Sequence, residues 1–192
     1  FFECFAVQIC KSKLHLPWQL VGGCISWANS KGRDRLEAEL LLCDLATNHM
    51  KNSAITVEEL RTCLETNNFW RAALLLARKS GQSGASIPFD QALSFYVASI
   101  KSSSAYTATK NAAATMESKK AHVFEFIDLR MECLVSEGVA PEAEQNVNLC
   151  QVLIANITAL AAIDMKKTVI LIQAYLLSNM TAIIEATRLS PL

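Results

Sequence analysis

Apolar and polar positions along the chain recur with the spacing of α-helices. Apolar side chains return every three or four residues through most of the sequence, as they do on the buried face of an amphipathic helix. No stretch shows the sustained alternation of apolar and polar residues that a half-buried strand requires. The pattern therefore predicts an all-α fold of antiparallel helical hairpins, an α-solenoid-like stack or an irregular bundle, with about eight or nine helices.

Helix starts and stops divide the first half of this pattern. The helices expected there are 1–14, 17–28, 34–50, 57–67 and 69–80. Pro17 is placed to open the second, because the first helical position needs no backbone amide. Thr56 and Glu59 form a capping box, in which hydroxyl and carboxylate satisfy the first amides of a helix. Gly81 is expected to end the fifth helix.

The second half contains longer helical stretches. The helices expected there are 88–100, 112–138, 141–163 and 167–189. Gly138 is a natural C-cap, and Asp164 is expected to separate the last two helices. Residues 101–120 are rich in Ser, Thr, Ala and Lys, which fits either a polar linker or the exposed start of a long helix.

These segments suggest a domain organisation. We expect a helical hairpin region over 1–100, the polar stretch 101–120, and a C-terminal bundle of long helices over 121–192, or one continuous domain in place of these parts. The chain begins at Phe1 with no initiator Met and no basic leader, so no signal peptide is visible. A piece of a longer polypeptide, or a processed chain, is expected.

Composition narrows the class of protein. Hydrophobic residues make up 52% of the chain and charged residues 19%, which is typical of a globular protein with a large core. Gly (6) and Pro (4) are scarce, which favours long helices over many short strands. The formal net charge is zero and no basic stripe is present. Nucleic acid is therefore not expected as a partner.

The cysteines and tryptophans are predicted to be buried. No CxxC pair occurs, and the odd number and scattered spacing indicate reduced thiols and not a disulfide framework. The cysteines are Cys4, Cys10, Cys24, Cys43, Cys63, Cys133 and Cys150. Trp18, Trp27 and Trp70 fall among apolar helical positions and are expected to anchor the core. A reducing compartment implies an intracellular protein, in the cytoplasm or nucleus.

Two uncharged stretches, 145–163 and 168–184, approach the length of a membrane span. Both contain many amides and hydroxyls, which are costly in lipid. The polar residues are Gln145, Asn146, Asn148, Gln151, Asn156, Thr158, Gln173, Ser178, Asn179 and Thr181. For 145–163 the favoured interpretation is a mostly buried helix with one solvent-facing polar stripe, formed by Gln145, Asn148, Gln151 and Asn156. A membrane hairpin over 145–184 is kept as an alternative.

The sequence contains no recognisable catalytic, cofactor-binding or metal-binding constellation. None of His15, His49 and His122 has a second ligand at a helical spacing, and no HExxH motif occurs. The Gly-rich segment 81–84 lacks both the final glycine and the preceding strand of a nucleophile elbow. Acidic pairs lie only one or two residues apart, which places them on different helix faces. They are Glu37/Glu39, Glu58/Glu59 and Glu142/Glu144. The chain is therefore predicted not to be an enzyme and to need no cofactor, although residues on separate helices can form a site without a linear motif.

One internal similarity points to helical repeats. Residues 38–43 and 72–77 share a pattern of small and Leu residues at a separation of 34, the period of tetratricopeptide hairpins. The segments 69–79 and 89–96 look like successive helices of degenerate repeats. Over residues 34–137 the chain resembles the α-solenoid (tetratricopeptide/HEAT-like) scaffold subunits of large eukaryotic complexes, of which the Integrator complex is one example. The resemblance implies a non-enzymatic role in holding other subunits together, and a nuclear location.

The favoured function is a non-catalytic scaffold or protein–protein interaction module within a larger assembly. Its expected partners are other protein subunits, bound through apolar helix faces. Two alternatives remain open: a helical bundle that binds a small apolar ligand, and the membrane hairpin described above. No small-molecule substrate is identified by any motif in the sequence.

Overall fold

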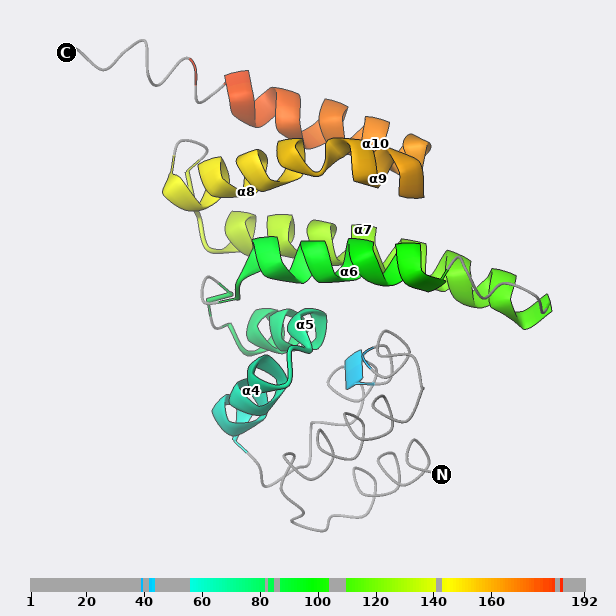
Figure 1. Ribbon diagram of the computed structural model, residues 1–192. Helices are drawn as coiled ribbons and strands as arrows, with labels where there is room; N and C mark the ends of the chain where they lie inside the picture. Colours follow the sequence, from blue (N-terminus) through cyan, green and yellow to red (C-terminus); the bar gives the residue numbers. More distant parts are fainter. Residues whose placement is uncertain are drawn as a thin grey trace. The chain divides into compact units, whose positions relative to one another are not determined.

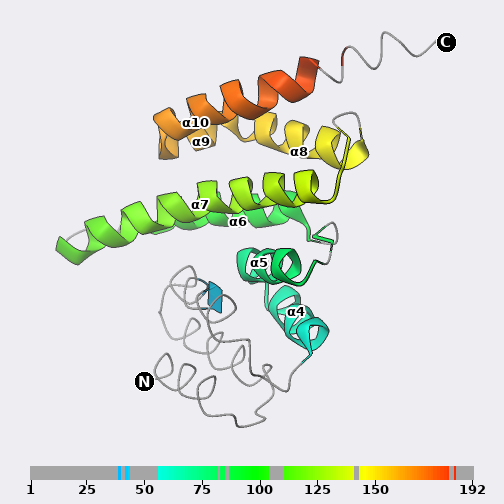
Figure 2. The same ribbon diagram turned by 180° about the vertical axis from the view of Figure 1, so that it is seen from behind.

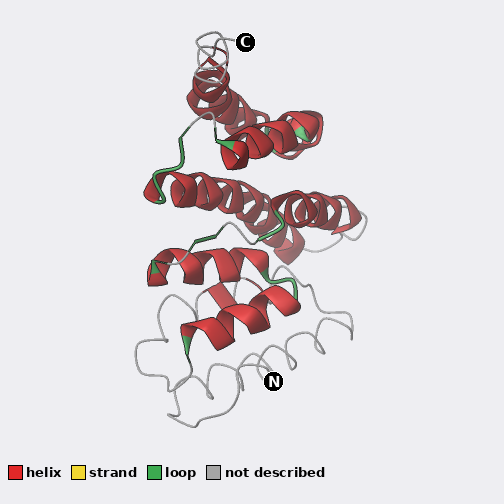
Figure 3. Cartoon of the chain, turned by 90° about the vertical axis from the view of Figure 1, so that its left-hand side faces the viewer, coloured by secondary structure: helices red, strands yellow, loops and turns green. Residues whose placement is uncertain are grey.

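The computed structural model describes residues 39, 42, 43, 56–81, 83, 84, 87–103, 110–140, 143–181 and 184 (Figure 1). Every regular element among them is a helix, and loops and turns join these helices (Figure 3). The all-α prediction is confirmed for this part of the chain. The chain forms two compact units, 1–87 and 88–192. The helices expected at 1–14 and 17–28 lie outside the described residues.

The first unit contains helix α4 (Val57–Thr66), which begins at the predicted capping box. The Thr56 hydroxyl accepts a hydrogen bond of 3.2 Å from the Glu59 amide. The Glu59 carboxylate in turn accepts one of 3.1 Å from the Thr56 amide. Both bonds satisfy amides that a helix start leaves without a partner, which is why the helix begins here.

A Schellman motif joins α4 to α5 (Trp70–Ser80). The amide of Asn68 donates to the carbonyl of Glu65 and that of Phe69 to the carbonyl of Leu64. Asn68 has a φ of 59°, which asparagine tolerates better than most residues with a Cβ. The motif turns Phe69 into the interior, where it is fully buried.

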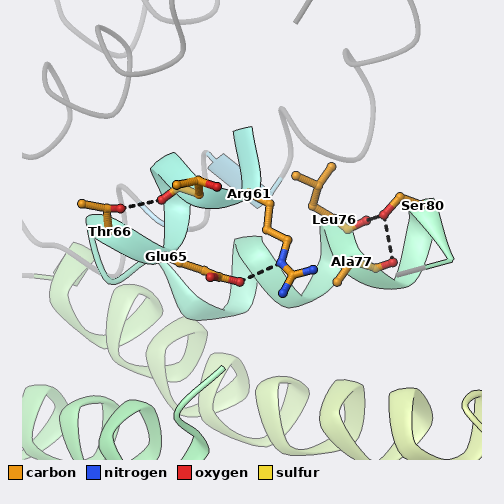
Figure 4. Close-up of polar contacts among 7 residues, drawn as sticks. Arg61, Glu65, Thr66, Leu76, Ala77 and Ser80 are labelled. Atoms are coloured by element: carbon orange, nitrogen blue, oxygen red, sulfur yellow. Dashed lines mark hydrogen bonds and ion pairs between the residues drawn. The ribbon is translucent and has the colours of Figure 1, made fainter. Parts of the chain in front are cut away.

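Helices α4 and α5 pack through apolar side chains. The buried residues are Leu60, Cys63, Leu64, Trp70, Ala72, Ala73, Leu74, Leu76 and Ala77. The polar groups in Figure 4 bond within their own helices: Arg61 with Glu65, and the Ser80 hydroxyl with the Leu76 and Ala77 carbonyls. Gly81 ends α5 in the left-handed conformation, as predicted.

The start of α5 is held by a carboxylate from far along the chain. Its N-cap, Phe69, makes no side-chain cap. Glu39 is buried, and its Oε1 accepts hydrogen bonds of 2.7 Å from the Arg71 amide and 3.4 Å from the Ala72 amide. This residue belongs to the expected helix 34–50, of which the described residues 39, 42 and 43 are helical and buried. A carboxylate also complements the positive end of the helix dipole.

In the second unit, α6 (Phe89–Ser103) and α7 (Lys110–Ser136) lie side by side (Figures 1 and 2). Of the polar stretch 101–120, residues 101–103 end α6 and residues 110–120 begin α7, two residues earlier than expected. Aromatic rings join the two helices: Phe89 stacks on Phe126 at 5.2 Å, and Tyr96 meets Phe126 edge-on at 5.0 Å.

Helix α7 ends at Ser136, and Gly138 terminates it, as predicted, in a second Schellman motif. The Gly138 amide donates to the carbonyl of Val135 and the Val139 amide to that of Leu134. Gly138 has a φ of 67°, and a Cβ there would meet nothing within 4 Å. Glycine is therefore favoured at this position for its backbone freedom and not for lack of space.

The prediction of one helix over 141–163 is wrong. The structure has two helices, α8 (Glu144–Ala155) and α9 (Ile157–Ile163), that meet at 62°. The break lies at Asn156, whose side-chain amide donates to the Val152 carbonyl at 2.9 Å and so competes with the backbone ladder.

The last described helix is α10 (Met165–Leu171), which continues as a π-helical turn, η3 (Ile172–Leu176). Asp164 separates α9 from α10, as predicted, and its carboxylate caps the new helix by accepting from the Lys167 amide at 3.1 Å. The helix begins at Met165, two residues earlier than expected. Helical residues continue through 181, and the π turn was not predicted.

Candidate functional site on the last helix

The helix formed by α10, η3 and the residues after them exposes large apolar side chains. These are Met165, Val169, Ile170, Leu177, Met180 and Ile184, with exposed fractions from 40% for Met180 to 62% for Met165. The opposite side of the same helix is buried through Thr168, Leu171 and Leu176. The helix is therefore apolar on both sides. We call the set Met165, Val169, Leu177, Met180 and Ile184 the outer stripe.

The π turn brings the two halves of the outer stripe into line. Leu177 follows Met165 by twelve residues, which in an unbroken α-helix would separate them by about 120° around the axis. The wider i→i+5 turn of η3 takes up most of that offset. The exposures agree with this geometry, since Leu177 is exposed while its neighbour Leu176 is buried.

Charged residues flank the sequence of this surface, with Asp164 before it and Glu185 after it. Lys166 and Lys167 are exposed at the start of α10, and residues 168–184 carry no charged side chain. The Lys167 ammonium lies 5.5 Å from the centre of the Phe124 ring on α7, a cation–π contact. Desolvation raises the pKa of the Asp128 carboxyl on α7; Glu132 and Glu125 add to this rise and Lys167 opposes it.

A partly buried polar cluster joins η3 to α8 and to the loop before it. The Tyr175 hydroxyl donates a hydrogen bond of 2.9 Å to Oδ1 of Asn146 on α8. The Asn146 amide donates in turn to the carbonyls of Ala140 at 2.7 Å and Val139 at 3.3 Å, in the loop after α7. One asparagine thus joins the π turn to the α7–α8 connection.

The electrostatics of this cluster keep its acidic groups protonated. Burial raises the pKa of Tyr175; the Cys150 thiol adds to the rise and the Arg130 guanidinium opposes it. Burial also raises the pKa of Cys150. The reactive form of cysteine is the thiolate, which a raised pKa disfavours. The cluster therefore suits hydrogen bonding more than nucleophilic chemistry.

A second group of titratable residues lies on the inner face of α7. His122 is fully buried and meets the Tyr96 ring of α6 edge-on at 5.0 Å. Lys119, three residues earlier, is also buried, and burial lowers the pKa of its ammonium. His122 was among the candidate residues expected from the sequence, and Lys119 was not. The available signal was its spacing, which puts it on the same helix face as the histidine.

The structure places the remaining predicted residues as follows. Cys43, Cys63, Cys133 and Cys150 are buried thiols, and Trp70 is buried, as predicted. Glu59 belongs to the capping box, and Glu144 lies in the first turn of α8. Within the described ranges, no three His, Cys, Asp or Glu side chains lie together in a way that could hold a metal ion. His15, His49 and Glu142, like the other cysteines and tryptophans, lie outside these ranges.

The described helices bear on the membrane alternative. No single described helix combines the length and hydropathy of a membrane span. Helices α8 and α9 reach both only when taken together, across their 62° bend. Two Asn-x-Thr sequences, 156–158 and 179–181, match the pattern for N-glycosylation. The side-chain amides of Asn156 and Asn179 each donate to the carbonyl four residues earlier.

Comparison with known proteins found no match. No protein-family model, no curated protein and no solved structure matches this chain. The resemblance to helical-repeat scaffold subunits therefore stays a prediction, and the function is argued from the geometry of α10 and η3.

Proposed function

We propose that this chain is a non-catalytic helical module that binds another protein subunit through the outer stripe. The observation that supports the proposal is the line of exposed Met, Val, Leu and Ile side chains on a helix whose other side is already buried. Folding of the unit uses only the buried side. Exposed apolar side chains gathered on one helix in this way mark interaction sites in folded proteins.

The packing beneath the stripe supports the same proposal. The Tyr175–Asn146 bond and the contact of Lys167 with the Phe124 ring fix the helix at two points along its length. A surface held in this way loses little conformational entropy when a partner binds. The stripe is therefore presented as a preorganised face.

The proposal also covers the cellular location of the protein, the role of its polar cluster and its place in an assembly. The buried thiols support an intracellular location. The protonated state of Tyr175 and Cys150 supports a structural role for the cluster in place of a catalytic one. The resemblance to repeat scaffolds supports a place in a larger assembly.

Photo-crosslinking in cells tests this function. A benzophenone amino acid is placed at Val169 or Leu177 of the full chain, and at Gln151, an exposed position on α8, as the control. We expect one shared protein adduct from positions 169 and 177 and none from 151. Adding Leu177→Lys should abolish the adduct formed from position 169. Equal adducts at all three positions, or no adduct at any, would contradict the proposal.

A further inference from the structure

The sulfur atoms of the described residues differ in their access to solvent. The four cysteines among these residues are buried thiols. Met116 and Met131 on α7 are partly buried. Met165 and Met180 are exposed, by 62% and 40%. An oxidant dissolved in water therefore has its best access to the thioethers of Met165 and Met180.

The chemistry of the thiols strengthens this difference. Burial raises the pKa of the Cys150 thiol. Burial also raises the pKa of the Cys63 thiol, against an opposing hydrogen bond from the Asn67 side chain. The thiolate is the form of cysteine that reacts with peroxide, so a raised pKa slows its oxidation. A thioether has no proton to lose, and its oxidation depends on access to the oxidant.

The two exposed methionines lie near opposite ends of the outer stripe. Met165 and Met180 are fifteen residues apart, which is about 22 Å along a helix. A segment that lies along the stripe over this length covers both side chains. This holds for a helix of another protein and for a second copy of this chain alike.

We propose that Met165 and Met180 form a reversible oxidation site through which peroxide weakens binding at the outer stripe. This inference rests on the proposed function. The thioether sulfur donates an electron pair to one peroxide oxygen, and a sulfur–oxygen bond forms as the oxygen–oxygen bond breaks. The hydroxide that leaves takes the proton of the transferred hydroxyl and becomes water, so the sulfur loses two electrons and the peroxide gains two. A dithiol reverses the step: the sulfoxide oxygen leaves as water and the dithiol becomes a disulfide.

The product changes the surface and spares the core. A sulfoxide is polar where the thioether was apolar, and burying it without a hydrogen bond is costly. Its neighbours on the stripe, Val169, Leu177 and Ile184, have no side-chain donor to offer it. The buried side of the helix, with Leu171 and Leu176, contains no methionine. Oxidation should therefore lower the affinity of the stripe and leave the unit folded.

Peroxide treatment of the purified full chain tests the site. Peptide mass mapping measures sulfoxide formation at each methionine, and hydrophobic-interaction chromatography measures the apolar surface of the folded protein. We expect severalfold faster oxidation at Met165 and Met180 than at Met116 and Met131, with shorter retention and an unchanged circular dichroism spectrum. Methionine sulfoxide reductase with dithiothreitol should restore the retention. Peroxide should not shorten the retention of Met165→Leu/Met180→Leu, and it should shorten that of the control Met131→Leu as in the unaltered chain.

Cross-linking in cells tests the effect on binding. The adduct from a benzophenone amino acid at Val169 is measured before and after a pulse of peroxide, and each protein is compared with its own untreated yield. We expect the yield to fall about tenfold in the unaltered chain, which corresponds to the loss of one buried methionine side chain, and to persist in Met165→Leu/Met180→Leu. Met165→Gln/Met180→Gln, which is polar and of similar size, should lower the adduct without peroxide.

The other outcomes separate this inference from the proposed function. Equal oxidation rates at all four described methionines, or equal loss of retention in Met165→Leu/Met180→Leu and the unaltered chain, would overturn the site. An adduct from Val169 that does not respond to peroxide, or responds equally in Met165→Leu/Met180→Leu, would refute the regulation and keep the proposed function. Absence of the adduct in untreated cells would refute the proposed function, and the regulation with it.

Discussion

The α4–α5 hairpin and the α10–η3 helix differ in how far their apolar side chains are exposed. In the hairpin, apolar side chains are mainly buried, and the exposed positions carry residues such as Glu58, Arg78 and Lys79. In α10 and η3, buried Leu171 and Leu176 are matched by exposed Val169 and Leu177. The hairpin is explained by folding alone. The last helix carries apolar surface that folding does not use, which is why we assign it a partner.

The two regions also differ in what fixes their ends. The start of α4 and the turn after it are set by residues within a few positions of each other, through the capping box and Asn68. The π turn is held by a bond between Tyr175 and Asn146, which lie 29 residues apart. The start of α5 is also fixed by a residue distant in the sequence, because Glu39 lies 32 residues before Arg71.

The largest expected effect contrasts a buried side chain with an exposed one. Phe69→Ala removes a fully buried ring and should lower the unfolding free energy by about 3–5 kcal/mol. Leu177→Ala, at a position 55% exposed, should change it by less than about 0.5 kcal/mol. Urea unfolding followed by circular dichroism measures both. A comparable loss in the two variants would mean that the stripe belongs to the core.

The next effect concerns the long-range cap of α5. Glu39→Ala leaves the amides of Arg71 and Ala72 without this acceptor and should cost about 1–3 kcal/mol. Glu39→Gln keeps an acceptor oxygen and loses the charge, so its cost should be roughly half as large. The same unfolding measurement applies. If the two variants lose the same amount, the carboxylate charge matters more than the hydrogen bonds.

A smaller loss is expected at the π turn. Tyr175→Phe removes the hydrogen bond to Asn146 and should cost about 1 kcal/mol. A double-mutant cycle with Asn146→Ala separates this bond from the other contacts of the asparagine. We expect the double variant to be more stable than the sum of the single losses predicts. Simple additivity would show that the bond contributes nothing to holding η3.

The smallest effect depends on pH and links α7 to α10. The pKa of Asp128 is raised above its ordinary value of 3.8, so the folded state holds this proton more tightly than the unfolded state. Ionisation of Asp128 therefore lowers the stability of the folded state. This loss begins near pH 3.8 and is complete above the folded-state pKa. Asp128→Asn should stabilise the protein at pH 7 by a few tenths of a kcal/mol, because solvent screens this exposed group. The gain should vanish below the ordinary pKa.

Lys167 supplies the control for that prediction. Its ammonium opposes the rise in the Asp128 pKa, so the gain from Asp128→Asn should be larger in a Lys167→Gln background. Unfolding at pH 3 and pH 7 gives the comparison. A gain of equal size at both pH values would assign the effect to packing in place of ionisation.

The sequence predicts the first region better than the second, for a physical reason. Capping boxes and left-handed caps involve residues close together, so Thr56, Gly81 and Gly138 could each be identified. The bend at Asn156 goes with a bond between its side chain and the preceding turn, and the π turn is held by a bond to α8; the apolar periodicity of one segment contains neither. The cap from Glu39 is likewise invisible, because nothing near α5 in the sequence points to it.

The sequence led us to expect exposed apolar surface, but not which residues would form it. Protein partners were expected on apolar helix faces, and the run 168–184 is uncharged, but the face itself was not located. The run does not show which residues face outward, since Val169 and Leu171 have the same chemistry and opposite burial. The packing of the folded unit decides that, through the π turn and the Tyr175–Asn146 bond.

The π turn makes the outer stripe depend on how η3 is wound. If its five residues formed ordinary α-helix, Leu177 would lie about 120° from Met165 around the axis, and Met180 and Ile184 would leave the line of Val169 with it. Loss of one residue from η3 together with a return to α-helix would place Leu177 eleven residues after Met165, or about 20° around the axis, and would keep the line. The segment should therefore accept the loss of this one residue over evolution, whereas an insertion or deletion elsewhere between Val169 and Leu177 should rotate the two halves of the outer stripe apart.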